Sequence, residues 1–407
     1  MTKILRIYIF EGFRETVIES QVFSWAIALQ DIGLSTIGIS LTNRKLKTDN
    51  RLGEISQKYS IPVSSYQYSN YPLIREIQCL SAIAKVIRKH KKEYEKIVIQ
   101  TRMPGLIKIA QASRWLLGIK FIFDLRSSPL TEFLYANPSG KGITYRYRIH
   151  AFRKTEQQIV HNSDAVFCVS NVLKKYLLEN FAGRNLLPDK ITVIPGAANH
   201  KYFFFSKELR EEIRHKLSCS EKTVFIYSGR LNKQWQVPDK VFELFAAIHH
   251  NLNNSFFIIL TPDIEIARKH LEMKGIPESA AYIEYKELTQ INPYLNAADY
   301  AIVLRENLPI NHHASPTKIS EYLVTGLSVI ITHNLGDYST FIEEQQMGCV
   351  VDIDNPEYTE DVLAYLRKEM NQPEEYAMSR SKRAISAVHN YAMEQHILNI
   401  YNKFITI

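Results

Sequence analysis

The hydrophobic positions of the chain form short runs rich in β-branched residues, separated by stretches in which apolar residues recur every three or four positions. Short runs of this kind are typical of buried strands, and the longer stretches of amphipathic helices. In the first half the pattern predicts strands at Ile4–Phe10, Thr36–Ser40, Lys96–Gln100, Lys120–Asp124, Ala165–Ser170 and Ile191–Pro195. Helices are expected between them at Val17–Ile32, Arg75–His90 and Leu106–Leu117.

The second half repeats this alternation. Strands are expected at Thr223–Gly229, Ser255–Leu260, Ala281–Tyr285, Tyr300–Leu304, Ser328–Thr332 and Gly348–Asp352. Helices are expected at Val237–His250, Ile264–Lys274, Thr317–Val324 and Glu357–Arg367. Strand and helix in strict alternation, twice over, predict an α/β protein with two doubly wound, Rossmann-like domains. We expect them over residues 1–200 and 201–385, the break lying near Gly196–Ser220, followed by a helical tail over 386–407.

The composition agrees with this architecture and narrows the class of partner. The chain has 407 residues, 45% hydrophobic and 23% charged, which suits two globular domains. The net charge of +8 favours an anionic partner, namely nucleic acid, an anionic membrane surface or a nucleotide diphosphate, without choosing among them. Four scattered cysteines argue against disulfides and zinc. Without a long apolar segment or a signal-peptide pattern, we expect a cytoplasmic protein.

The segment SPTKISEYLVTGLSVI, which begins at Ser315, carries the strongest local signal. Ser315 and Pro316 are expected to be the N-cap and first residue of a helix that ends at Gly326. Ligands of open α/β sheets bind beyond the carboxyl ends of the strands, so this helix start would offer amide groups to a phosphate in a cleft between the two sheets. Lys318 opposes the helix dipole, which favours a nearby anion, and Glu321 could bind a ribose diol. A capped helix with both side chains solvated explains the segment equally well.

This segment resembles the donor-binding helix of the retaining family 4 glycosyltransferases, which have the GT-B fold, and in particular their bacterial surface-polysaccharide branch. Three further segments resemble the same family in the same order: DAVFCVSNVLKKYL, ITVIPGAANHKYF and FIYSGRLNKQWQ. The tail HNYAMEQHILNIYNKF resembles the helix that crosses back to the first domain. The resemblance covers nearly the whole chain and is weakest over the first 120 residues.

The resemblance implies roles for individual residues on the donor side. Glu321 matches the second glutamate of the family's Glu-x7-Glu motif, whereas the spacing puts His313 in the first position and the best local acidic match is Glu306. Arg230 and Lys233 match the cations that neutralise the donor diphosphate. Without the resemblance, two solvated residues of a surface loop would be the favoured interpretation. The implied donor-binding residues are Gly12, Arg230, Lys233, Ser315, Pro316, Thr317, Lys318 and Glu321.

In the first domain, charged residues follow buried strands. Asp124 and Arg126 lie at the end of FIFDLRSS, and Arg102 ends the preceding strand. Charge directly after an apolar run is costly unless it is paired, solvated or functional. The implied catalytic residues are Asp124, Arg126 and Glu306, with Arg102 on the acceptor side; a structural Asp–Arg pair is an equal alternative.

Two further patterns need an interpretation. Lys141–Lys154 contains five cations, three aromatic residues and no acid, which suits an anionic membrane surface or a phosphorylated or lipid-linked acceptor, or the basic face of an ordinary helix. RNA binding is not expected, because no RNA-binding motif accompanies it. Asp352-x-Asp354 is followed by Asn355-Pro356 and is better explained as a turn than as a metal site.

Together these features predict a glycosyltransferase that moves a sugar from a UDP- or GDP-sugar to a hydroxyl group of a glycan, lipid-linked or other acceptor, with retention and without a metal or other cofactor. Cell-surface polysaccharide synthesis, at the inner face of the membrane, is the implied setting. Two alternatives remain open: a nucleotide-sugar epimerase on the same fold, and a non-catalytic GT-B module that binds or scaffolds a partner.

Overall fold

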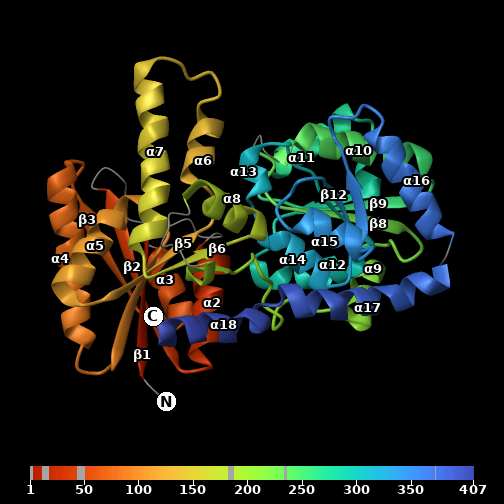
Figure 1. Cartoon of the computed structure of the whole chain (residues 1–407). Helices are drawn as coiled ribbons and strands as arrows, with labels where there is room; N and C mark the ends of the chain where they lie inside the picture. Colours follow the sequence, from red (N-terminus) through yellow and green to blue (C-terminus); the bar gives the residue numbers. More distant parts are fainter. Residues whose placement is uncertain (1–2, 12–17, 44–50, 182–187, 233–235, 372) are drawn as a thin grey trace. The chain divides into compact units, whose positions relative to one another are not determined.

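The chain folds into two compact units, each built on a parallel β-sheet with helices on both faces (Figure 1). The computed structural model describes residues 3–11, 18–43, 51–181, 188–232, 236–371 and 373–407. The first unit comprises Met1–Ile194 and His396–Ile407, and the second comprises Pro195–Gln395. The α/β class and the two doubly wound sheets are therefore as predicted, while the chain passes between the units at positions 194 and 395 rather than at 200 and 385.

The first unit has a seven-stranded sheet in the order β3-β2-β1-β4-β5-β6-β7, all parallel in pairing. Its strands are β1 (Ile4–Glu11), β2 (Leu34–Asn43), β3 (Val63–Tyr68), β4 (Lys96–Thr101), β5 (Lys120–Leu125), β6 (Ala165–Cys168) and β7 (Ile191–Val193). Its helices are α2 (Ser24–Gln30), α3 (Arg51–Lys58), α4 (Pro72–His90), α5 (Ile107–Leu117), α6 (Pro129–Ala136), α7 (Ile143–Asn162), α8 (Asn171–Phe181) and most of α18 (Met393–Thr406).

Alternation along β1 directs side chains to both faces of this sheet. Leu5, Ile7 and Ile9 join a core with α4, α5, α7 and α8, whereas Tyr8 and Phe10 join a second core beside α2. Because both faces are buried, the strand is almost continuously apolar, which is typical of parallel sheets. Within β1, the charged residue Arg6 is also buried.

The last helix, α18, packs onto the first unit, as the resemblance implies (Figure 1). The rings of Phe404 and Phe167 lie 6.3 Å apart, and the Lys96 ammonium donates a hydrogen bond of 2.6 Å to the carbonyl oxygen of Ile405. The helical tail is interrupted at Ala392, where the backbone pairs with Ala198 as an isolated parallel bridge. The bridge separates α17, which ends at Tyr391, from α18, which begins at Met393.

The second unit has a six-stranded parallel sheet in the order β10-β9-β8-β11-β12-β13. Its strands are β8 (Thr223–Ser228), β9 (Ser255–Leu260), β10 (Ala281–Glu284), β11 (Tyr300–Val303), β12 (Ser328–Thr332) and β13 (Gly348–Val351). Its helices are α9 (Lys207–Lys216), α10 (Pro238–Asn251), α11 (Ile264–Met273), α12 (Asn292–Ala297), α13 (Pro309–His312), α14 (Thr317–Val324), α15 (Tyr338–Glu344), α16 (Tyr358–Met370) and α17 (Pro373–Tyr391).

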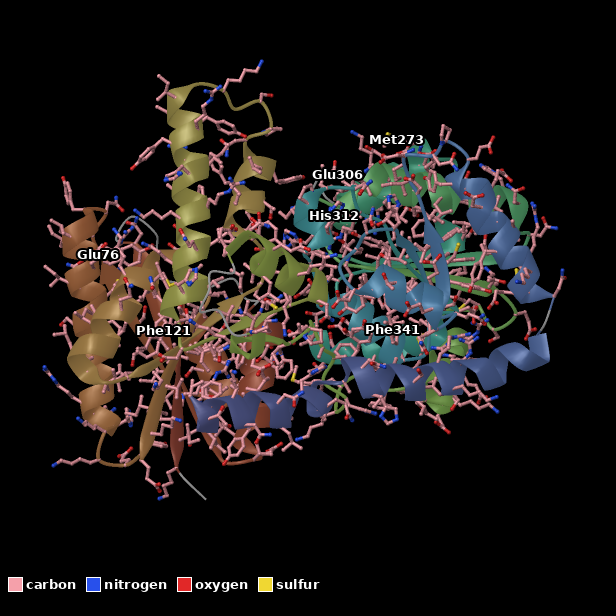
Figure 2. The ribbon with its side chains drawn as sticks, in the orientation of Figure 1. Glu76, Phe121, Met273, Glu306, His312 and Phe341 are labelled. Carbon is pink, nitrogen blue, oxygen red and sulfur yellow. The ribbon has the colours of Figure 1, made fainter. Side chains whose placement is uncertain are left out.

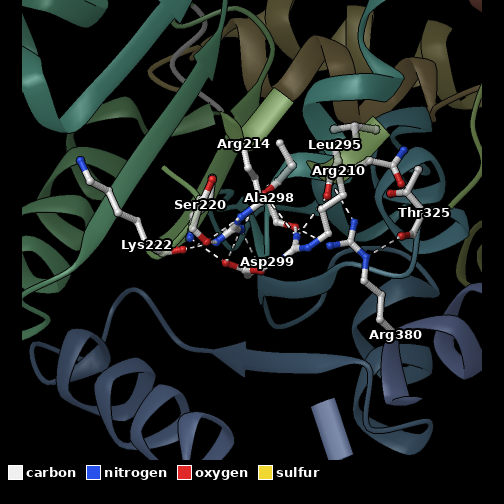
Figure 3. Close-up of polar contacts among 12 residues, drawn as sticks. Arg210, Arg214, Ser220, Lys222, Leu295, Ala298, Asp299, Thr325 and Arg380 are labelled. Carbon is white, nitrogen blue, oxygen red and sulfur yellow. Dashed lines mark hydrogen bonds and ion pairs between the residues drawn. The ribbon is translucent and has the colours of Figure 1, made fainter. Parts of the chain in front are cut away.

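A buried polar network ties α9 and α17 to the amino end of β11 (Figure 3). Asp299, directly before β11, pairs with Arg210 and Arg214 from α9 and accepts the backbone N–H of Val224 at 2.8 Å. Arg380 of α17 donates to three backbone carbonyl groups of the same region. This end of the sheet lies opposite the carboxyl ends of the strands, so the network serves the fold rather than ligand binding.

The predicted strands are all present, with ends shifted by a few residues, and the sequence pattern missed only the edge strand β3 among the described strands. The predicted helix at Val17–Ile32 is, from Glu19 on, a π-helix at Glu19–Phe23 followed by α2. All four cysteines are free thiols. Among the described residues, no helix is both long enough and apolar enough to cross a bilayer.

Candidate functional site

The start of α14 differs in detail from the prediction. The helix begins at Thr317, and Pro316, with extended backbone angles of φ −67° and ψ 121°, is its N-cap without any capping side chain. The expectation that Ser315 caps the helix and that Pro316 is its first residue is therefore wrong. The Ser315 hydroxyl is engaged elsewhere, because it accepts the backbone N–H of Gly196 at 2.8 Å and donates to the Tyr338 hydroxyl at 3.2 Å.

Gly196 fixes this entry into α14 by close contact. Its carbonyl oxygen accepts hydrogen bonds from the hydroxyl groups of Ser320 and Tyr338. A Cβ atom at position 196 would lie 2.2 Å from the carbonyl oxygen of Ser315, so only glycine permits the approach. The loop before the helix is thus held by hydrogen bonds on both sides of one residue, which keeps the first amides of α14 in a defined place.

The sheet topology places this helix start at a switch point. β8 lies between β9 and β11, so the connections after β8 and β11 run in opposite directions, and ligands of open α/β sheets bind at such a point. Lys318, in the first turn of α14, donates a hydrogen bond of 3.1 Å to the carbonyl oxygen of Ser228 at the end of β8. Its ammonium also lies 4.8 Å from the ring centre of Tyr227. Gly229 makes room, since a Cβ there would lie 2.9 Å from the Lys318 Nζ atom.

Burial shifts the pKa values of Lys318 and Glu321 in α14. It lowers the pKa of Lys318 to about 7, an effect reinforced by Arg305 and opposed by Glu321. It raises the pKa of Glu321, which is only 5% exposed, to about 7, against the opposing influence of Lys318. Among the described residues, none makes a hydrogen bond to the Glu321 carboxyl group. Two neighbouring ionisable groups whose pKa values burial shifts toward neutrality mark the start of α14 as a candidate functional site.

The loop after β8 carries the second predicted cation. Its backbone is fixed from two directions, because the Tyr227 hydroxyl donates to the carbonyl oxygen of Arg230 at 2.8 Å and Asp263 accepts the backbone N–H of Leu231 at 2.7 Å. Arg230 itself is exposed, which leaves its side chain accessible to a ligand. Two predicted donor-binding residues, Lys233 in this loop and Gly12 after β1, lie outside the described residues.

Glu306 lies in the loop between β11 and α13 (Figure 2). Its carbonyl oxygen accepts the backbone N–H of Leu308 at 2.9 Å and the side-chain amide of Asn311 at 2.8 Å. His313, the position that the motif spacing selects, is buried, and burial with His312 lowers its pKa to about 4. The neutral His313 at physiological pH is therefore no substitute for a carboxylate.

Sequence reasoning missed Arg305, which is the second residue after β11. It is 9% exposed, and its positive charge acts on the pKa of Lys318. The signal that could have found it is the one used for Asp124, namely a charged residue at the carboxyl end of an apolar strand.

In the first unit, three neighbouring strands bring the predicted acceptor-side residues together. Arg126 Nε lies 2.8 Å from Asp124 Oδ1, and the Tyr8 hydroxyl donates to Asp124 Oδ2 at 2.5 Å. Arg102 Nε donates to the Tyr8 hydroxyl at 3.2 Å. Burial alone would raise the pKa of Asp124, but Arg126, Arg102 and the Tyr8 hydrogen bond hold it below its usual value. Asp124 is therefore an ionised, buried carboxylate; Tyr8 and Arg6 were not anticipated from the sequence.

The basic segment Lys141–Lys154 contains the exposed first turns of α7, which extends beyond the strands of its unit (Figure 1). Ile143 is 87% exposed and Tyr147 72% exposed. The ring of Phe133 in α6 stacks on that of Phe152 at 4.8 Å, so α6 supports only one side of the helix.

The Asp352-x-Asp354 segment forms the predicted turn. The backbone N–H of Asp354 donates to Asp352 Oδ1 at 3.0 Å, and the N–H of Asn355 donates to the carbonyl oxygen of Asp352 at 3.1 Å. Within the described part of the chain, no group of three or more His, Cys, Asp or Glu side chains is arranged to hold a metal ion.

Comparison with known proteins gives structural relatives over the full length of the chain. HepE from Anabaena, in complex with UDP, matches with a TM-score of 0.70 and 13% identity and covers 100% of both chains. A glycosyltransferase from Rickettsia africae matches with a TM-score of 0.73 and 17% identity, covering 99% of each chain. WaaG, a glycosyltransferase involved in lipopolysaccharide biosynthesis, matches with a TM-score of 0.65 and 13% identity, covering 99% of this chain and 100% of that one.

A UDP-GlcNAc 2-epimerase from Neisseria meningitidis, bound to UDP-GlcNAc, is a weaker match, with a TM-score of 0.59 and 10% identity over 99% of this chain and 100% of that one. No protein-family model matches the chain, and no curated protein matches it significantly. At these identities the similarity concerns the fold alone. The two parallel sheets and their full-length match to these glycosyltransferases show that the chain has the GT-B fold.

Proposed function

We propose that the protein transfers a sugar from a nucleotide-diphosphate sugar to a hydroxyl group of an acceptor, with retention of configuration, in the synthesis of a cell-surface polysaccharide. The observation that carries the proposal is the contact between Lys318 and Ser228, which sets a partly buried cation and the first turn of α14 at the switch point of the second sheet. HepE is seen with UDP on the same fold, and the sequence resemblance supplies the family and its retaining chemistry.

On this proposal the second unit binds the donor. Lys318 and the first amides of α14 receive the diphosphate, Arg230 adds positive charge from the loop after β8, and Glu321 accepts hydrogen bonds from the ribose hydroxyl groups. As the bond between the anomeric carbon and the diphosphate breaks, these groups stabilise the charge on the departing nucleoside diphosphate. The protein itself thus offers the charge that a metal ion supplies in other transferases. The acceptor hydroxyl oxygen forms the new glycosidic bond as the bond to the diphosphate breaks, and its proton passes to the departing nucleoside diphosphate.

In the first unit, Asp124 is the residue we propose to contact the acceptor, since it is an ionised carboxylate. Arg126 remains protonated and so acts by orienting a group rather than by accepting a proton. Glu306 is proposed to act near the sugar or the phosphates.

A thermal-shift screen against UDP-, GDP-, ADP- and CMP-sugars tests the proposal. A donor at about 100 times its dissociation constant stabilises a fold by roughly 2.7 kcal/mol. Glu321→Ala and Arg230→Ala are expected to abolish sugar transfer while leaving a folded protein. A protein that no nucleotide stabilises would be a scaffold module instead. Conversion of the sugar nucleotide to an isomer without an acceptor would identify the epimerase that the Neisseria relative represents.

We further propose that the segment Lys141–Lys154 contacts an anionic bilayer. The segment has five cations and no acid, and exposed Ile143 and Tyr147 suit the headgroup region. Each cation near such a surface contributes about 1 kcal/mol. Sedimentation with phosphatidylglycerol vesicles, but not with phosphatidylcholine vesicles, is expected, and the double variant Arg146→Ser/Arg148→Ser should lose it. Arg88→Ser/Lys89→Ser, on the exposed end of α4, is the matched control; equal loss in both would refute a specific contact.

A further inference from the structure

A group of three arginine residues, of which Arg6 is buried and Arg102 and Arg126 are partly exposed, lies at the switch point of the first sheet. β1 lies between β2 and β4. The chain continues from β1 to β2 on one side of the sheet and from β4 to β5 on the other, so the switch point lies between β1 and β4. Arg6 lies on β1, Arg102 follows β4, and Arg126 follows β5. The Tyr8 ring joins them, since it contacts the guanidinium groups of Arg6 and Arg102 with 4.6 Å and 5.8 Å to its centre. The cluster thus occupies the part of an open α/β sheet where ligands bind.

The charges of this cluster do not balance. Asp124 is the single carboxylate that the described residues contribute to it, and it is already paired with Arg126. The other guanidinium groups contact neutral partners: Arg102 donates to the Gln21 side chain at 3.0 Å and Arg6 to the Gln100 side chain at 2.8 Å. Three cations and one anion leave two positive charges without a counter-charge in the cluster.

Arg126 Nε is paired with Asp124, but two other guanidinium nitrogen atoms of this cluster, Arg6 Nη1 and Arg102 Nη2, are buried without a hydrogen-bond partner among the described residues. Arg6 is only 2% exposed. A buried donor that makes no hydrogen bond costs about 1–3 kcal/mol of stability, and more when it is charged. Arg102 and Arg126, by contrast, are partly exposed and can be reached from outside. The first sheet therefore maintains, at a cost in stability, an electropositive site that an oxyanion would complete.

We propose that Arg102 and Arg126, with the charge of Arg6 behind them, bind a phosphate or carboxylate group of the acceptor. Guanidinium forks match both groups with two parallel hydrogen bonds, and low exposure strengthens such bonds. The inference rests on the proposed function for the role of the anion as part of an acceptor, but the binding of an anion here does not depend on turnover. The acceptor class it names is a phosphorylated or carboxylated glycan or lipid-linked sugar.

Titration of inorganic phosphate into the full-length protein tests this site. UDP binding is measured first, and the phosphate titration is then run in the presence of saturating UDP, at constant ionic strength, by calorimetry. Phosphate binding is expected to persist under UDP and to weaken at least tenfold in Arg102→Gln. Asp124→Asn, which removes the single negative charge of the cluster, is expected to strengthen phosphate binding several-fold. Arg88→Gln, an exposed arginine on α4, is the matched control and should change nothing.

The two variants are expected to change phosphate affinity in opposite directions, which a purely structural role would not do. If the cluster had a structural role alone, Arg102→Gln and Asp124→Asn would both lower the thermal midpoint and neither would change phosphate affinity, which overturns the proposal. Loss of all phosphate binding under saturating UDP would assign the anion to the donor and overturn the acceptor assignment. A protein that fails to bind UDP but binds phosphate through Arg102 would count against the proposed donor while leaving the anion subsite in place.

Discussion

The ammonium group of Lys318 is hydrogen-bonded to the carbonyl oxygen of Ser228 at 3.1 Å, although the two residues lie 90 positions apart. This contact joins the first turn of α14 to the end of β8. It holds a lysine of lowered pKa at the switch point of the second sheet, where the connections after β8 and β11 run in opposite directions. A helix gains nothing from a lysine in its first turn, because the helix dipole disfavours it. The arrangement supports the proposal that this cation binds an anionic ligand.

Lys318→Met separates the two roles of this side chain. Removing a buried cation relieves a desolvation cost, so the ligand-free variant is expected to be as stable as the wild type or more stable by about 1 kcal/mol. UDP affinity should fall at least tenfold, since a charge-assisted hydrogen bond is worth about 1.5–3 kcal/mol. Urea unfolding and calorimetry measure the two effects, with exposed Lys175→Met as the control. Unchanged UDP affinity would remove Lys318 from the donor site.

Glu321 makes the stability of the ligand-free protein depend on pH. Its folded pKa of about 7 lies above the ordinary value of 4.5, so its contribution is fully present below pH 4.5 and is lost as the pH rises through 7. Glu321→Gln should abolish this fall, which amounts to at most ~3 kcal/mol. Urea unfolding at a series of pH values checks it, with exposed Glu272→Gln as the control. A variant with the wild-type slope between pH 4.5 and 7 would contradict the burial of a neutral carboxyl group.

Lys318 makes the stability of the ligand-free protein depend on pH above 7. Its folded pKa of about 7 lies below the ordinary value of 10.5, so its contribution is present above pH 10.5 and is lost as the pH falls through 7. The same Lys318→Met variant is therefore expected to lose the rise in stability between pH 7 and pH 10. An unchanged rise would mean that the ammonium group is solvated in the folded state.

Arg380 is expected to be important for stability and not for binding. It is 3% exposed and donates to the carbonyl oxygens of Thr325, Ala298 and Leu295. Arg380→Ala leaves these acceptors buried, at a cost of about 3 kcal/mol or more. Arg268→Ala, on an exposed face of α11, should cost less than about 0.5 kcal/mol. Urea unfolding measures both, and the UDP affinity of the folded fraction of Arg380→Ala should match that of the wild type.

Gly326 ends α14 with φ +73°, a conformation that disfavours other residues. A Cβ atom there would also lie 2.4 Å from the carbonyl oxygen of Arg380. Gly275 has nearly the same φ, +68°, but nothing within 4 Å of the corresponding Cβ position. We expect Gly275→Ala to cost about 1 kcal/mol and Gly326→Ala about 3 kcal/mol, because only the second adds a backbone clash. Equal losses of unfolding free energy would show that φ alone decides.

The sequence determined the elements of this fold, because most strands are buried on both faces and therefore appear as apolar runs. The exception, β3, is an edge strand with the polar sequence VSSYQY, half of it in partial contact with solvent, so that no hydrophobic signal marks it. The span of α14, with Gly326 beyond its end, also followed from local chemistry.

Contacts between distant residues were decided only by the tertiary structure. The Ser315 hydroxyl makes hydrogen bonds with Gly196 and Tyr338, two residues distant in the sequence. Because it is engaged with them, it does not cap the helix. Likewise, the hydrogen bond from Tyr8 to Asp124 depends on the strand order, which places β1 and β5 on either side of β4. Local propensities act over only a few residues of the chain. Strand order depends instead on burying all the apolar faces together, and that order determines which charged strand ends become neighbours.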